Sequence, residues 1–149
     1  MDPDDTAASF ARGLAAARTP FLWLTAGPKP AVPDGGEVLQ LTTLRGGMGT
    51  ADPRRLRDLR TAATTFFDER GPGVVMVDCL ASLILHSGVE RVLRFVEDLH
   101  EEIAIRNGFL VVFADAQRTN ARMIAWLERE LDSFPRHARA PRVEDRLVV

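Results

Sequence analysis

The chain has 149 residues, of which 46% are hydrophobic and 27% are charged, a composition typical of a single soluble domain with its own core. Its formal net charge of -2 gives no general attraction to nucleic acids or anionic membranes, so neither is expected as a partner. A single cysteine, Cys79, excludes an internal disulfide framework and suits a reducing compartment. No apolar run approaches the roughly 20 residues of a membrane span, and the acidic start is unlike a secretory signal. We therefore expect one cytoplasmic domain over residues 1–149, which could also be a module of a longer protein.

The first part of the chain predicts a short helix followed by two strands. Met1–Asp5 is expected to be a loose tail, and the alanine-rich Thr6–Arg18 carries apolar residues at helical spacing. Phe21–Thr25 is apolar almost throughout, as in a buried strand. A loop rich in proline and glycine separates it from a second strand at Val38–Thr42. Because this second strand mixes polar and apolar residues, we expect it in a more exposed part of the sheet.

A long helix and the central strand follow. Arg45–Ala51 predicts a loop, and Asp52–Arg70 predicts a helix that begins with a capping acid and a proline. Val74–Val77 is an apolar, mostly β-branched run, which is typical of a strand covered on both faces. After it, Leu80–Leu85 is expected to form a short turn or an extended piece over the edge of the sheet.

The last third predicts two more helices and two more strands. Ser87–Glu90 has the pattern of a capping box, which opens a long amphipathic helix. Asn107-Gly108 predicts a left-handed stop for that helix, and the apolar Phe109–Ala114 predicts a second buried strand. A helix over about Thr119–Ser133 and a possible edge strand at Val143–Val149 complete the chain.

Strands that alternate with helices predict right-handed crossovers and an α/β fold. The expected architecture is a three-layer α/β/α sandwich with a mostly parallel sheet. The strands Phe21–Thr25, Val74–Val77 and Phe109–Ala114 should be parallel neighbours in its interior, because all three are largely apolar. The remaining two strands should lie further out.

Acidic residues follow two of these strands, where open α/β sheets bind their ligands. Asp78 follows Val77 and Asp115 follows Ala114, so both carboxylates could face one crevice and bind a small ligand. Three roles for Asp78 are open: acceptor of N–H groups in the turn after its strand, ligand or metal contact, and phosphorylation as in receiver domains. The structural role is favoured. No histidine is spaced to join the two acids, so no metal is expected.

Other motifs point to no known catalytic chemistry. The loop at 27–30 has prolines where a phosphate loop needs N–H donors, and the loop at 46–50 lacks the lysine. We therefore expect neither nucleotide hydrolysis nor a cofactor. Cys79 and Ser82 are the candidate nucleophiles near His86, but a cysteine after an apolar strand is more often a small buried hydrophobe.

Two further features concern the surface. Arg54, Arg55, Arg57 and Arg60 are interleaved with acids on the helix after residue 53, so a solvated face is expected and nucleic-acid binding is not. Trp126 falls near the margin of the apolar stripe of the last helix. It could anchor an interface with a protein partner or with a second copy.

The block of about residues 73–134 resembles the domain-of-unknown-function family 835, found mainly in archaea. The family pattern is a hydrophobic strand ending in Asp, then Leu, an apolar pair, Gly, a Val-Leu-x-Phe helix core and a closing helix. These features fall on Asp78, Leu80, Leu83-Ile84, Gly88, Val92–Phe95 and Leu127–Leu131. The chain has Cys79 and Ala81 where a glycine and an acid usually follow the Asp, which lowers the expectation of a shared ligand site.

The resemblance implies a degenerate relative of RecA-like ATPases, with a P-loop-like topology but no phosphate loop. It also implies a place beside sensor modules in signalling proteins. We therefore expect a non-enzymatic regulatory module that acts in signal transduction through protein contacts or self-association. The alternatives are a small-ligand or nucleotide-binding domain that uses Asp78 and Asp115, or an atypical phospho-receiver.

Overall fold

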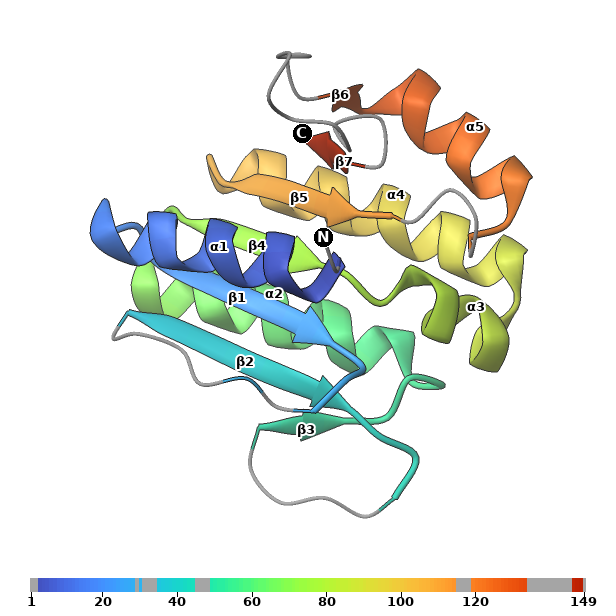
Figure 1. The fold of residues 1–149 in the computed structure, drawn as a ribbon, viewed down its shortest axis with the longest axis horizontal. Helices are drawn as coiled ribbons and strands as arrows, with labels where there is room; N and C mark the ends of the chain where they lie inside the picture. The colour runs from blue at the N-terminus through green and yellow to red at the C-terminus, as the bar shows by residue number, and fades with distance from the viewer. Residues whose placement is uncertain are drawn as a thin grey trace.

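The computed structural model describes residues 3–28, 30, 35–44, 49–114, 119–133 and 146–148. Within these ranges the chain forms one seven-stranded sheet with the order β3-β2-β1-β4-β5-β7-β6 (Figure 1). The first five strands are parallel, and β7 is antiparallel to both β5 and β6. The strands are β1 Phe21–Thr25, β2 Gly36–Leu41, β3 Thr50–Ala51, β4 Val74–Val77, β5 Phe109–Phe113, β6 Asp132–Ser133 and β7 Arg146–Val148.

The described helices lie on both faces of this sheet, which confirms the predicted α/β/α sandwich. In Figure 1, α1 crosses in front of the strands, whereas α2 and α4 lie behind them. A smaller core joins α1 to one face, and a larger core joins α2, α3, α4 and α5 to the other. The helices are α1 Pro3–Ala16, α2 Leu56–Arg70, α3 Leu80–Ser87, α4 Val89–Ile105 and α5 Ala121–Glu130.

The centre of the sheet follows the sequence prediction. β4 lies between β1 and β5, and its four residues are all buried. β2 lies outside β1 and β7 lies outside β5, as expected for the more polar strand and the C-terminal strand. The prediction of an edge strand at Val143–Val149 is wrong, however, because β6 pairs with the far side of β7. The short strand β3 also replaces the end of the predicted loop Arg45–Ala51.

The helix α2 has the predicted inward face but a later start. Its buried side chains recur at helical spacing: Leu56, Leu59, Ala63, Phe66 and Phe67. Asp52 does not cap the helix, because its Oδ1 accepts a hydrogen bond from the Arg54 N–H at 2.9 Å and so closes the preceding turn. The N-cap position is Arg55, which makes no side-chain capping bond.

Two other local predictions are wrong. Leu80–Leu85 is not a turn or an extended piece, because it forms most of α3. Ser87 does not cap α4: it is the last residue of α3, and Gly88 with a φ of 86° separates the two helices. The Gly88 N–H ends α3 by donating to the Ile84 carbonyl at 2.8 Å. The positive φ at this junction favours glycine over any other residue.

At the two ends of the described chain the boundaries also differ. The helix α1 begins at Pro3, within the expected tail Met1–Asp5. Asn107 has a φ of 60°, which confirms the left-handed stop after α4. The last helix begins later than predicted, because the Asn120 side chain caps it by accepting from the N–H groups of Arg122 and Met123.

Candidate functional site

The register of the sheet decides which way the Asp78 side chain points. Trp23 on β1 is paired with Met76 on β4, and Leu24 is paired with Val77. Because side chains alternate between faces, Asp78 lies on the same face as Trp23 and Thr25. That face carries the smaller core, which includes Trp23 and is covered by α1. Asp78 therefore points along the face of the sheet that α1 covers.

The Asp78 carboxylate joins the two central strands. Its Oδ2 accepts a hydrogen bond from the Trp23 indole N–H at 2.9 Å and from the Thr25 hydroxyl at 3.3 Å. Both donors are buried, with 3% of Trp23 and 5% of Thr25 exposed. A carboxylate acceptor makes such bonds stronger than a neutral acceptor would. This arrangement supports the structural role for Asp78, although these donors are side chains of β1 and the prediction was N–H groups of the following turn.

Cys79 is a buried core residue, as the sequence predicted. Its side chain is 4% exposed, and the thiol lies 3.5 Å from the Leu24 carbonyl, to which it can donate. Burial, followed by the charge of Asp78, raises the pKa of the Cys79 thiol well above its ordinary range. A nucleophilic cysteine needs the opposite environment, because the thiolate is the reactive form.

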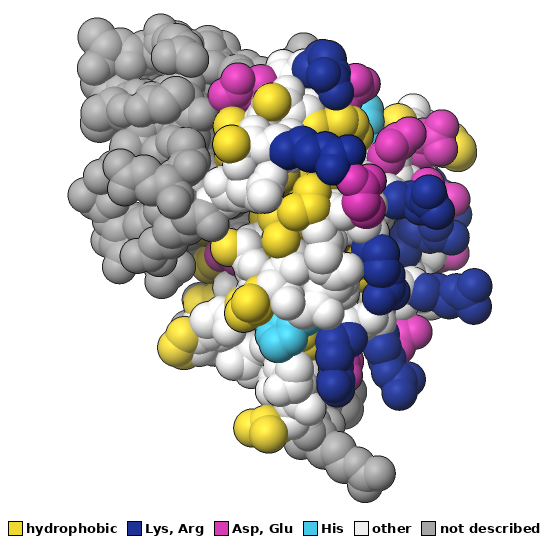
Figure 2. Space-filling view, turned by 90° about the vertical axis from the view of Figure 1, so that its right-hand side faces the viewer, with side chains coloured by type: hydrophobic (Ala, Val, Ile, Leu, Met, Phe, Trp, Pro, Cys, Tyr) yellow, Lys and Arg dark blue, Asp and Glu magenta, His cyan; other side chains and the backbone are white. Residues whose placement is uncertain are grey.

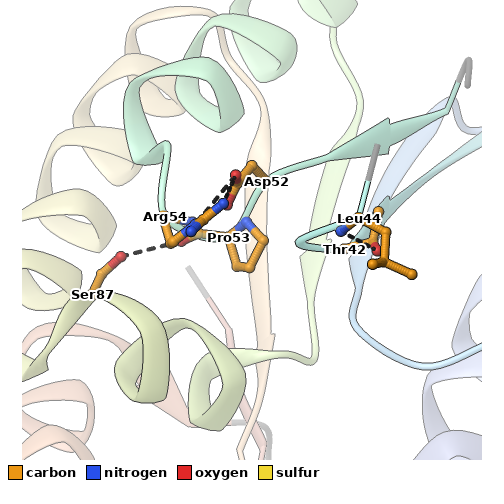
Figure 3. Close-up of polar contacts among 6 residues, drawn as sticks. All are labelled: Thr42, Leu44, Asp52, Pro53, Arg54 and Ser87. Atoms are coloured by element: carbon orange, nitrogen blue, oxygen red, sulfur yellow. Dashed lines mark hydrogen bonds and ion pairs between the residues drawn. The ribbon is translucent and has the colours of Figure 1, made fainter. Parts of the chain in front are cut away.

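The other nucleophile candidate, Ser82, lies on α3. Ser82 and His86 lie one turn apart on α3, but no hydrogen bond joins them among the described residues. Ser87, at the end of the same helix, instead donates from its hydroxyl to the Pro53 carbonyl at 3.1 Å (Figure 3). This bond fixes the end of α3 against the segment that precedes α2.

The same edge of the sheet carries a second local network. Asp52 forms an ion pair with Arg54 at 2.8 Å in addition to its bond with the Arg54 N–H (Figure 3). These bonds lower the pKa of the Asp52 carboxyl from its ordinary value of 3.8 to about 2. Arg54 and Asp52 thus satisfy each other, and this part of the predicted basic cluster is neutral.

The predicted site residues do not all lie in the described part of the chain. Asp115, the proposed second acid of the crevice, lies outside it. The pairing of Asp78 with Asp115 stays a prediction for this reason. Among the described residues, no three His, Cys, Asp or Glu side chains are grouped closely enough to hold a metal ion. In the same ranges, no helix has the length and apolar character needed to cross a membrane.

Trp126 lies where the sequence placed it, at the margin of α5. It is half-buried and packs against the larger core, while Met123 and Leu127 on the same helix are fully buried. Part of the indole therefore faces solvent, and its role in an interface stays a prediction.

Comparison with curated proteins gives no match, and comparison with solved structures gives none either. A family model described as a protein of unknown function, DUF835, matches residues 7–131. The archaeal distribution and the RecA-like ancestry that the sequence suggested are not part of this match and stay predictions. The matched range contains all five parallel strands together with α2, α3 and α4. Because the match covers most of the chain, the protein belongs to the DUF835 family.

Proposed function

We propose that this protein is a non-enzymatic regulatory module of signal transduction that works through protein contacts. The observation that carries the proposal is the surface of α3. Leu80 and Leu83 on this helix are buried in the larger core. Leu85 is 80% exposed, and Ala81, one turn earlier on the same side, is also exposed, whereas the half-buried Ile84 packs against the larger core.

A helix that is apolar on both faces is normally buried on both. Here Ala81 and Leu85 of α3 are left to solvent beside the exposed His86, at the carboxyl edge of the sheet. Burying Leu85 against a partner would contribute about 1.5–3 kcal/mol, enough to make it an anchor of an interface. The half-exposed Trp126 on α5 is a second candidate contact for such a partner. We call the exposed side chains of Ala81 and Leu85 the α3 surface.

The non-enzymatic part of the proposal is supported by the two residues that sequence patterns offered for chemistry. The Asp78 carboxylate is engaged by Trp23 and Thr25, and the Cys79 thiol is buried with a raised pKa. Each has a structural role that a catalytic role would disturb.

Site-specific photocrosslinking tests the proposal. A benzophenone amino acid would replace Leu85 in the whole protein, expressed in its native cells, and the matched control would carry it at Ile105. Ile105 is also exposed, at 75%, but lies at the far end of α4. We expect a discrete protein adduct from position 85 and none from position 105. Equal, diffuse labelling from both positions would contradict a specific surface on α3.

A further inference from the structure

A groove of about 350 Å³ runs between α2 and α4 on the side facing away from the sheet. Figure 2 shows basic side chains gathered along the right of that view, which is the side of the α2 and α4 layer. The floor of the groove includes Leu56 and Phe95, both buried. Its walls are charged and consist of Arg57, Arg60, Glu90, Arg91, Arg94 and Asp98.

The arginines form two rows that face each other across the groove. Arg57 and Arg60 lie one turn apart on α2, and Arg91 and Arg94 lie one turn apart on α4. Residues at this spacing project from the same side of a helix, so each row presents its guanidinium groups together. The sequence analysis identified only one of these rows, the basic residues that include Arg57 and Arg60, and not the row on α4.

Internal ion pairs neutralise only part of the groove. Arg60 pairs with Asp98 at 3.1 Å, and Glu90 pairs with Arg122 on α5. Within the described ranges, Arg57, Arg91 and Arg94 have no carboxylate within ion-pair distance. Three positive charges therefore converge on one groove of a chain whose formal net charge is -2.

We propose that this groove binds an acidic, amphipathic segment of a partner protein. The inference rests on the proposed function and names the chemistry of the partner. Separate carboxylates spaced along a peptide can each pair with one guanidinium, and an apolar side chain between them can reach toward Leu56 and Phe95. A compact phosphate fits less well, because the unpaired guanidinium groups are divided between α2 and α4, whereas carboxylates spaced along a peptide can reach each of them.

The position of the groove connects it with the α3 surface. The Ser87 hydroxyl is bonded to the Pro53 carbonyl, so the end of α3 lies against the segment that leads into α2. A partner could therefore place its apolar residues on α3 and its acids between α2 and α4. Charged groups beside an apolar anchor add orientation and association rate to the affinity of the anchor.

Fluorescence anisotropy of the whole protein with a synthetic probe tests the proposal. The probe is a labelled helical peptide of about 15 residues made of glutamate and leucine, and a peptide with glutamine for glutamate is its control. We expect the glutamate peptide alone to bind, with an affinity that falls as salt rises from about 0.05 to 0.5 M. Arg91→Gln with Arg94→Gln should weaken binding at least about tenfold, whereas Arg12→Gln with Arg129→Gln should not.

Charge reversal gives a second, independent readout. Arg91→Glu with Arg94→Glu should lose the glutamate peptide and gain a lysine–leucine peptide of the same pattern. No binding to wild type at millimolar peptide, or equal weakening by the matched control pair, would overturn the proposal. Tighter binding of pyrophosphate or an RNA oligonucleotide, lost in Arg91→Gln with Arg94→Gln, would overturn it in favour of a phosphate ligand. An adduct from position 85 whose yield is unchanged in that double variant would overturn the groove proposal while leaving the protein-contact function standing.

Discussion

Replacing Asp78 tests the structural role that the hydrogen bonds assign to its carboxylate. In Asp78→Ala, the buried indole N–H of Trp23 loses an acceptor at 2.9 Å and the Thr25 hydroxyl loses one at 3.3 Å. Leaving a buried donor unpaired costs about 1–3 kcal/mol, and the indole cannot turn toward water because Trp23 is 3% exposed. The hydroxyl can rotate to another acceptor, so we assign most of the cost to Trp23.

The expected loss of unfolding free energy is therefore about 2–3 kcal/mol for Asp78→Ala. Asp78→Asn should lose less, about 1 kcal/mol, because an amide oxygen can still accept from the indole but without the negative charge. For a chain of this length each kcal/mol corresponds to roughly 2–4 °C in Tm. Asp78→Ala should thus lower Tm by roughly 4–12 °C.

Urea and thermal unfolding followed by circular dichroism measure these differences. Glu97→Ala is the matched control, because Glu97 is an exposed acid on α4 without an ion pair among the described residues. A cycle with Trp23→Phe isolates the indole bond: in that background Asp78→Ala should cost about 1–2 kcal/mol less. If either Asp78 variant is more stable than wild type, the structural role is wrong, and the crevice deserves study as a ligand site. A coupling energy near zero between Trp23→Phe and Asp78→Ala would also refute the structural role, because it would mean that the indole bond does not contribute to stability.

Four other outcomes follow from the structure. Gly73→Ala should lower the unfolding free energy by about 2 kcal/mol or more in denaturant unfolding, because the new Cβ would lie 2.5 Å from the Pro20 carbonyl oxygen. Gly13→Ala, at an exposed position of α1, should be neutral or stabilising. The Cys79 thiol should react with Ellman's reagent only on unfolding, and rapid reaction of the native protein would contradict its burial. Asp52→Asn should lower Tm at neutral pH. The difference in Tm between wild type and variant should disappear as the pH falls from 3.8 through about 2, because a carboxyl whose pKa is lowered by folding stabilises the fold only while it is ionised. ATP and GTP turnover with magnesium should not exceed that of buffer, and turnover that vanishes in Asp78→Asn would show otherwise.

The central strands could be predicted because their signal is local. A run such as Val74–Val77 has no polar residue to place in solvent, so it fits only a strand that is covered on both faces. The inward face of α2 was equally clear, since five apolar residues recur at helical spacing over four turns. The short α3 was missed for the opposite reason: in only eight residues, apolar side chains occur on the exposed side as well as on the buried side, which leaves no clear amphipathic period.

The hydrogen-bond partners of Asp78 and the rows of the groove could not be predicted locally. Trp23 and Asp78 are 55 residues apart, and they meet only because β1 and β4 pair in one register. Likewise, Arg57 and Arg91 face each other only after α2 and α4 pack side by side. Charge patterns within one helix showed a basic face of α2, but the opposing row on α4 depends on the topology.

The layers of the sandwich separate the two roles assigned to this molecule. Asp78 lies on the face that α1 covers, whereas the α3 surface and the arginine groove belong to the opposite layer. At the carboxyl edge, where open α/β sheets usually bind ligands, the acid after the central strand accepts hydrogen bonds from β1. The guanidinium groups of the groove and the exposed Leu85 of α3 face outward, and they are suited to a protein surface more than to a small substrate. Because substitutions at distant sites without shared partners act independently, loss of Asp78 should weaken the fold without changing recognition, and loss of Arg91 and Arg94 should do the reverse.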